Sequence, residues 1–111
     1  MRRILAYMVC VTVVLGAGGA WAAGLPEYDS SAYCKHFAER GKGGYTAESG
    51  CMQMEQESKT VLAAMSIEPK ILNYCDNFTK KGTRRSGGGG SYTVLKGCVE
   101  MEISSKKSLG Q

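Results

Sequence analysis

The residues of this chain with the widest range of possible chemistry are its cysteines. The sequence has 111 residues and 5 of them are cysteines. In chain order these are Cys10, Cys34, Cys51, Cys75 and Cys98. A thiolate can act as a nucleophile, a redox centre or a ligand for a soft metal, and in an oxidising compartment two thiols form a disulfide. The choice among these uses depends on the compartment and on the residues that accompany the cysteines.

Few residues accompany the cysteines as a base or as further ligands. His36 is the only histidine, and Met52 and Met54 supply soft sulfur beside Cys51. A cysteine nucleophile needs a base, and a bound metal needs several ligands. We therefore expect no enzymatic activity, no metal and no cofactor, with thiol-redox or copper handling as the alternative.

A basic, glycine-rich stretch could bind an anion. It reads KKGTRRSGGGGSY, and no Gly-Lys-Ser/Thr follows it, so it is not a P-loop. Clustered positive charge favours a phosphate group of the cell envelope or an acidic partner, although such runs are more often simply solvated. The residues assigned to this possible anion- or partner-binding site are Lys80, Lys81, Arg84, Arg85, Ser91 and Tyr92.

The first 22 residues predict the compartment. A basic start (MRR) is followed by an apolar run and the small-x-small sequence AWA, which is the pattern of a cleaved Sec-type signal peptide. The apolar run is too short and too rich in glycine for a spanning helix, so no membrane anchor is expected after cleavage. We expect a periplasmic or secreted protein, with residues 1–22 removed and 23–111 forming one domain.

The composition of residues 23–111 narrows the class of protein further. Two of the 14 basic residues lie in the signal, so 12 basic and 10 acidic residues remain and the net charge is +2. A charge this small makes nucleic acid an unexpected partner. A domain of this size has a marginal core. With Cys10 removed, an even number of cysteines remains, which indicates a disulfide framework.

Two segments of the mature chain repeat one pattern. Starting at Tyr33 and again at Tyr74, the chain reads Y-C-x-x-F-x-x-[RK]-G, then a glycine-bearing loop, then Y-T-x-x-x-G-C-x-x-M-E-x-x-S-K. So many matches in one order indicate an internal duplication, over about 28–65 and 66–111.

Each copy predicts two helices joined by a loop. Apolar spacing and end signals predict helices over 29–41, 51–65, 66–82 and 97–109, with the second and third as antiparallel neighbours. The predicted fold class is all-α: two tandem disulfide-stapled αα-hairpins packed as one small four-helix domain. The duplication favours the pairs Cys34–Cys51 and Cys75–Cys98, and pairing between the copies stays open.

Three sets of matched residues have structural interpretations. The methionines are spaced as core residues, and the tyrosines are expected to pack over a disulfide and the hairpin turn. Each glutamate is expected to pair with the lysine four residues later on its helix surface. The methionines are Met54 and Met101, and the tyrosines are Tyr45 and Tyr92. The glutamate–lysine pairs are Glu55 with Lys59 and Glu102 with Lys106.

One further pattern links the chain to other proteins. The segment CDNF…GGSYTVLKGCVEME, and in weaker form CKHF…GGYTAESGCMQME, resembles small exported bacterial proteins of uncharacterised function that carry this unit singly or in tandem. The resemblance implies export and disulfides and carries no activity. We expect a non-enzymatic binding or structural module whose partner is a macromolecule, either a protein or an anionic envelope component such as lipopolysaccharide.

Overall fold

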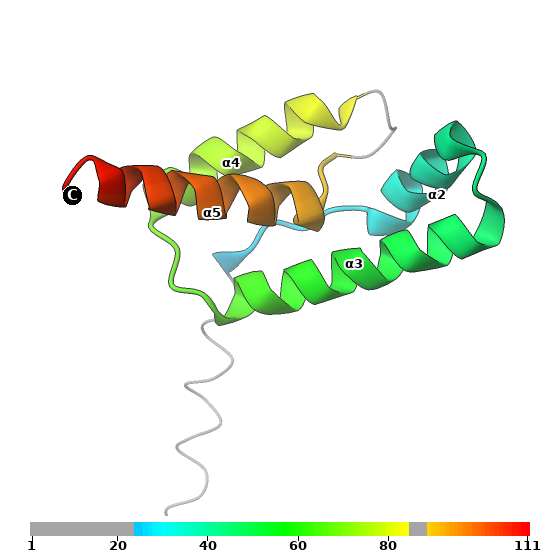
Figure 1. The fold of residues 1–111 in the computed structure, drawn as a ribbon, viewed down its shortest axis with the longest axis horizontal. Coiled ribbons are helices and arrows are strands. Elements are labelled where there is room, and N and C mark those ends of the chain that lie inside the picture. The colour runs from blue at the N-terminus through cyan, green and yellow to red at the C-terminus, as the bar shows by residue number, and fades with distance from the viewer. Residues whose placement is uncertain (1–23, 85–88) are drawn as a thin grey trace, which may run out of the picture.

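The computed structural model describes residues 24–84 and 89–111, and the predicted signal peptide lies outside them. The helices are α2 (Ser30–Gly41), α3 (Gly44–Ala64), α4 (Pro69–Gly82) and α5 (Tyr92–Ser108) (Figure 1). The described residues contain no strand, which confirms the all-α prediction. Among them, no helix combines the length and the apolar character needed to cross a membrane.

The helices form two hairpins, each closed by its own disulfide as predicted. Unit 1 is α2 with α3, and unit 2 is α4 with α5. Cys34 bonds to Cys51 with their Cα atoms 5.5 Å apart, and Cys75 bonds to Cys98 at 5.6 Å. The bridges close loops of 17 and 23 residues, so each stabilises the fold by about 3 kcal/mol through the entropy of the unfolded chain.

Local signals set most of the helix ends. The Asp29 carboxylate accepts a hydrogen bond from the Ala32 N–H at 3.0 Å and caps α2, and Lys42 ends the same helix in the left-handed region at φ 55°. Pro69 begins α4 and Ser91 caps α5. Both second helices begin earlier than predicted, because the Tyr-Thr segments assigned to loops are helical.

The two units meet mainly through α3 and α5. Both helices run from right to left in Figure 1, and α5 begins beside the middle of α3. The expectation that α3 and α4 are the neighbouring pair is wrong. The linker between them is extended at both ends, with ψ 148° at Met65 and 132° at Glu68, so it carries the chain away from α3 before α4 begins.

The core lies between unit 2 and the C-terminal half of α3. Its buried members are Leu62, Ile71, Cys75, Tyr92, Leu95, Cys98 and Val99. By contrast, α2 buries only Cys34 and Ala38. Unit 1 therefore has little apolar interior of its own and depends on its bridge and on unit 2.

The predicted core positions of the methionines are wrong. Met54 is 55% exposed and Met101 71%. Phe37 and Phe78, the phenylalanines of the repeated Y-C-x-x-F pattern, are each about half exposed. The stripe that α3 buries consists of Cys51, Glu55, Ser58 and Leu62. Since half of it is polar, apolar spacing alone selects the wrong face.

Candidate functional site

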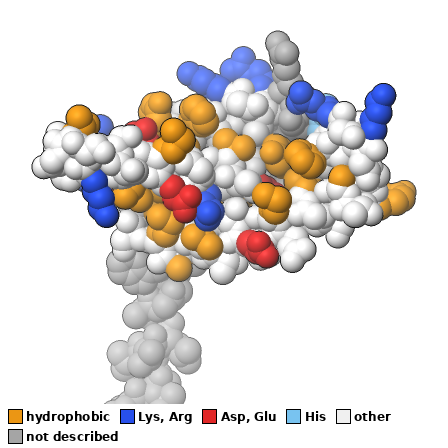
Figure 2. All heavy atoms as spheres, in the orientation of Figure 1, with side chains coloured by type: hydrophobic (Ala, Val, Ile, Leu, Met, Phe, Trp, Pro, Cys, Tyr) orange, Lys and Arg blue, Asp and Glu red, His pale blue; other side chains and the backbone are white. Residues whose placement is uncertain are grey.

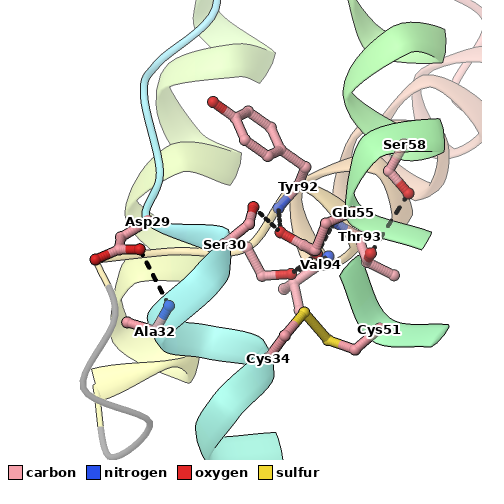
Figure 3. Close-up of a disulfide and its surroundings, with 11 residues drawn as sticks. Asp29, Ser30, Ala32, Cys34, Cys51, Glu55, Ser58, Tyr92, Thr93 and Val94 are labelled. Atoms are coloured by element: carbon pink, nitrogen blue, oxygen red, sulfur yellow. Dashed lines mark hydrogen bonds between the residues drawn. A yellow bond between two sulfur atoms is a disulfide. The ribbon is translucent and has the colours of Figure 1, made fainter. Parts of the chain in front are cut away.

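The most unusual polar group of the molecule is the carboxylate of Glu55, which is 1% exposed (Figure 3). Its Oε1 accepts hydrogen bonds from the Ser30 hydroxyl at 2.7 Å and from the Tyr92 N–H at 2.9 Å. Its Oε2 accepts from the Ser91 hydroxyl at 2.6 Å and from the Thr93 N–H at 2.9 Å. Four donors from two helices and a loop thus converge on one side chain of α3.

This arrangement makes Glu55 a cap for a helix of the other unit. The first N–H groups of α5 have no partner within their own helix, and the positive end of the helix dipole favours a negative charge there. Burial raises the pKa of Glu55, but the hydrogen bonds from Ser91 and Thr93 outweigh it and hold the pKa below its ordinary value of 4.5. The group is therefore an ionised acceptor at neutral pH, which is a structural role.

The expected pairs of glutamate with lysine on the helix surface do not form. Among the described ion pairs none includes Glu55, and the Lys59 Nζ lies 5.3 Å from the centre of the Tyr92 ring. In unit 2, Lys106 pairs with Glu68 of the linker instead of Glu102.

Tyr92 is the anchor of the segment that precedes α2. Its hydroxyl donates to the Pro26 carbonyl at 2.9 Å and accepts from the Tyr28 N–H at 3.1 Å, and the two tyrosine rings lie 4.8 Å apart. The Tyr28 hydroxyl donates to Asp76 at 2.7 Å. Burial raises the pKa of the Tyr28 phenol, and the bond to Asp76 raises it further. Residues 24–29 are thus tied to unit 2.

The predicted position of the tyrosines is wrong for Tyr45, which is 90% exposed. Its counterpart Tyr92 is buried, at 3% exposure, but its ring partner is Tyr28. The same sequence element therefore has opposite environments in the two units.

Replacing Gly90 by alanine is expected to destabilise the fold by about 2 kcal/mol or more. Gly90 has φ +134°, and a Cβ there would lie 2.6 Å from the Tyr28 ring. Thermal unfolding followed by circular dichroism measures the effect. The matched control is Gly89→Ala, since a Cβ at Gly89 meets no atom within 4 Å. Equal melting temperatures for the two variants would refute this role for Gly90.

The structure separates the residues assigned to the anion site. Lys80, Lys81 and Arg84 are exposed at the end of α4, where Lys80 also pairs with Asp76 at 3.1 Å. Figure 2 shows basic side chains gathered along the corresponding edge. Arg85 lies outside the described residues.

The two remaining members of that set lie in the interior. Ser91 is 0% exposed and Tyr92 is 3% exposed. Ser91 is fixed by Glu55 and also by Thr79, whose hydroxyl accepts from the Ser91 N–H at 3.0 Å. Neither residue shares a surface with the basic side chains.

The cysteines are all used in bridges within the described chain. Cys34 and Cys75 are 0% exposed. No group of three or more His, Cys, Asp or Glu in the described ranges is placed to hold a metal ion. His36 has a buried Nδ1 without a hydrogen-bond partner there, but it belongs to no such group of three or more.

The surface carries apolar side chains at equivalent positions of the two units. They are Phe37 and Phe78 on the first arms, and Met54 and Met101 on the second arms. Figure 2 shows apolar side chains reaching the surface over both α3 and α5. Their repetition in both copies is a feature that core packing does not explain.

Comparisons of this chain with protein-family models, with curated proteins and with solved structures found no match.

Proposed function

We propose that this protein is an exported, non-enzymatic binding or structural module of the periplasm or the cell exterior. The observation that carries the proposal is that the chemically reactive residues have structural roles, while large apolar side chains lie at the surface. The cysteines are paired in bridges and the buried carboxylate caps α5, whereas large apolar side chains stay exposed in both units. The buried residues hold the scaffold rigid, and the exposed ones are available to a partner.

The partner surface consists of the repeated apolar positions. Phe37 and Phe78 are 52% and 51% exposed. Aromatic residues and methionine are enriched where proteins contact each other. A stapled scaffold presents these side chains without a large loss of conformational freedom on binding.

Photo-crosslinking tests this function. A photoreactive amino acid at position 37 or 78, introduced in cells that produce the protein, is expected to yield an adduct with the same macromolecule from both positions. The control position is Lys107, exposed near the end of α5. Mass spectrometry of the same material is expected to show a chain that begins at Ala23 and has no thiol open to alkylation. Absence of adducts at both positions, or adducts equally strong at Lys107, would refute the apolar partner surface.

The same material distinguishes the other two functions that the sequence left open. Free thiols or bound copper would favour the redox or metal protein. The exposed Lys81 and Arg84 favour, as a second candidate, binding to an anionic envelope component. That candidate requires sedimentation with vesicles containing anionic lipid, lost at high salt and in the double variant Lys81→Ala, Arg84→Ala.

A further inference from the structure

The contact between the two units has the form of an insert in a groove. The groove lies between α2 and α3, where Ser30, Glu55 and Lys59, together with Tyr92 of α5, line a remaining cavity of about 240 Å³. The insert is the start of α5, Ser91–Thr93, whose donors bind the Glu55 carboxylate (Figure 3). The Ser58 hydroxyl adds a contact of 3.4 Å to the hydroxyl of Thr93. We call this the occupied groove.

Unit 2 has the equivalent groove, and no residue of unit 1 lines it. A cavity of about 260 Å³ lies between α4 and α5. The repeat places Glu102, Ser105 and Lys106 at the positions of Glu55, Ser58 and Lys59, and all three line this cavity. Glu102 makes no hydrogen bond or ion pair with any described residue, and Leu109 at the rim is 75% exposed. We call this the open groove.

Unit 1 has the matching insert, and it is free. The start of α3, Gly44–Thr46, corresponds to Ser91–Thr93. Tyr45 is 90% exposed, whereas Tyr92 in the same place of unit 2 is 3% exposed. No side chain of residues 24–84 or 89–111 caps the start of α3. One copy of the duplicated contact is therefore made within the chain, and both halves of the other copy have no partner among the described residues.

We propose that a second copy of this chain inserts the start of its α3 into the open groove, with Tyr45 in the place of Tyr92 and the Glu102 carboxylate on the N–H groups of Tyr45 and Thr46. The start of α3 and the end of α5 lie at opposite sides of the molecule (Figure 1), so a chain cannot fill its own groove. The contact is head to tail, and it repeats in each added copy. It goes beyond the proposed partner surface, because it does not use Phe37 or Phe78.

Three differences between the units make the contact between copies weaker than the one within the chain. The hydroxyls of Ser30 and Ser91 each donate a hydrogen bond to Glu55. Their counterparts in the repeat are Ile71 and Gly44, which have no hydroxyl to donate to Glu102. Glu102 would thus accept two hydrogen bonds instead of four. Glu48 also stands at the place of Leu95, which is fully buried. We therefore expect association that is reversible and depends on concentration.

Analytical ultracentrifugation of the mature, oxidised protein tests the proposal. The mean mass is expected to rise with concentration, and Tyr45→Ala or Glu102→Gln is expected to keep the protein monomeric over the same range. Both residues lie at the surface or its edge, so circular dichroism is expected to show an unchanged fold. Phe37→Ala, outside both the groove and the insert, is the control that leaves association unchanged.

Mixing the two monomeric variants distinguishes head-to-tail contact from any other kind. The Tyr45→Ala chain keeps a working groove and the Glu102→Gln chain keeps a working insert. Their mixture is expected to form a dimer and nothing larger. A wild-type mass that stays monomeric at every concentration overturns the proposal, as does association that survives in both variants. Loss of association in Glu102→Gln alone overturns the assignment of Tyr45 as the insert.

Discussion

Replacing Glu55 by glutamine is expected to lower the free energy of unfolding by about 3 kcal/mol. Each carboxylate oxygen accepts two hydrogen bonds. A glutamine amide has one oxygen and one NH₂ group, so whichever oxygen is replaced, two donors lose their acceptor in the interior. For a domain of this size the melting temperature is expected to fall by about 15 °C, measured by circular dichroism.

The same carboxylate makes stability depend on pH. The pKa of Glu55 is lowered in the folded state, so its contribution is fully present above the ordinary value of 4.5 and is lost as the pH falls through the lower, folded value. The wild-type melting temperature is expected to fall in that acidic range by more than that of the Glu55→Gln variant. At concentrations where the wild type is monomeric, Glu102→Gln is the matched control, expected to change stability by no more than about 0.5 kcal/mol. A Glu55→Gln protein as stable as this control would contradict the capping role.

Replacing Cys34 and Cys51 together by alanine is expected to release α2 from the fold. The loss of the bridge costs about 3 kcal/mol. The helix has 12 residues and buries only Cys34 and Ala38, and isolated helices of that length are marginal in water. Hydrogen exchange measured by mass spectrometry is expected to show the α2 amides losing most of their protection, while α5 keeps its own.

The second bridge provides the comparison for this experiment. Cys75 and Cys98 belong to the core cluster, so their replacement by alanine is expected to lower protection across the whole domain rather than in one helix. If α2 stays protected in the first variant, its attachment depends on other contacts, and the bridge of unit 1 is not what holds it.

The sequence was sufficient for the parts of the fold that depend on spacing and repetition. The helical hairpins and both disulfide pairs could be predicted because each is encoded within one unit. A cysteine in each arm of a short hairpin restricts which sulfurs can meet.

The contact between the units could not be predicted in the same way. It depends on a buried glutamate, and a glutamate with a lysine four residues later has the pattern of an exposed helix pair. The residues that bind Glu55 lie 25 to 38 positions away in the sequence. The sequence does contain one signal for this contact, the serine-tyrosine-threonine at the start of α5. A serine before a helix indicates a helix cap. The pattern of the basic stretch instead places Ser91 and Tyr92 in an anion site.

The exposed methionines show the other limit of sequence patterns. Met54 and Met101 follow their glycine-cysteine pairs at helical spacing, but α3 turns Glu55 and Ser58 inward beside Cys51. A stripe that contains polar residues is invisible to a search for apolar ones, so the neighbouring face was selected.

The placement of the bridges also determines how the domain responds to mechanical force. Both disulfides close within a unit, so the units are joined covalently only through the linker between α3 and α4. A pull on the two ends of the oxidised chain would part the units and straighten the outer segments, while the loops of 17 and 23 residues stay closed. Reduction would add roughly 130 Å of extension. In an array of such chains under tension, each hairpin would therefore act as a link of fixed length.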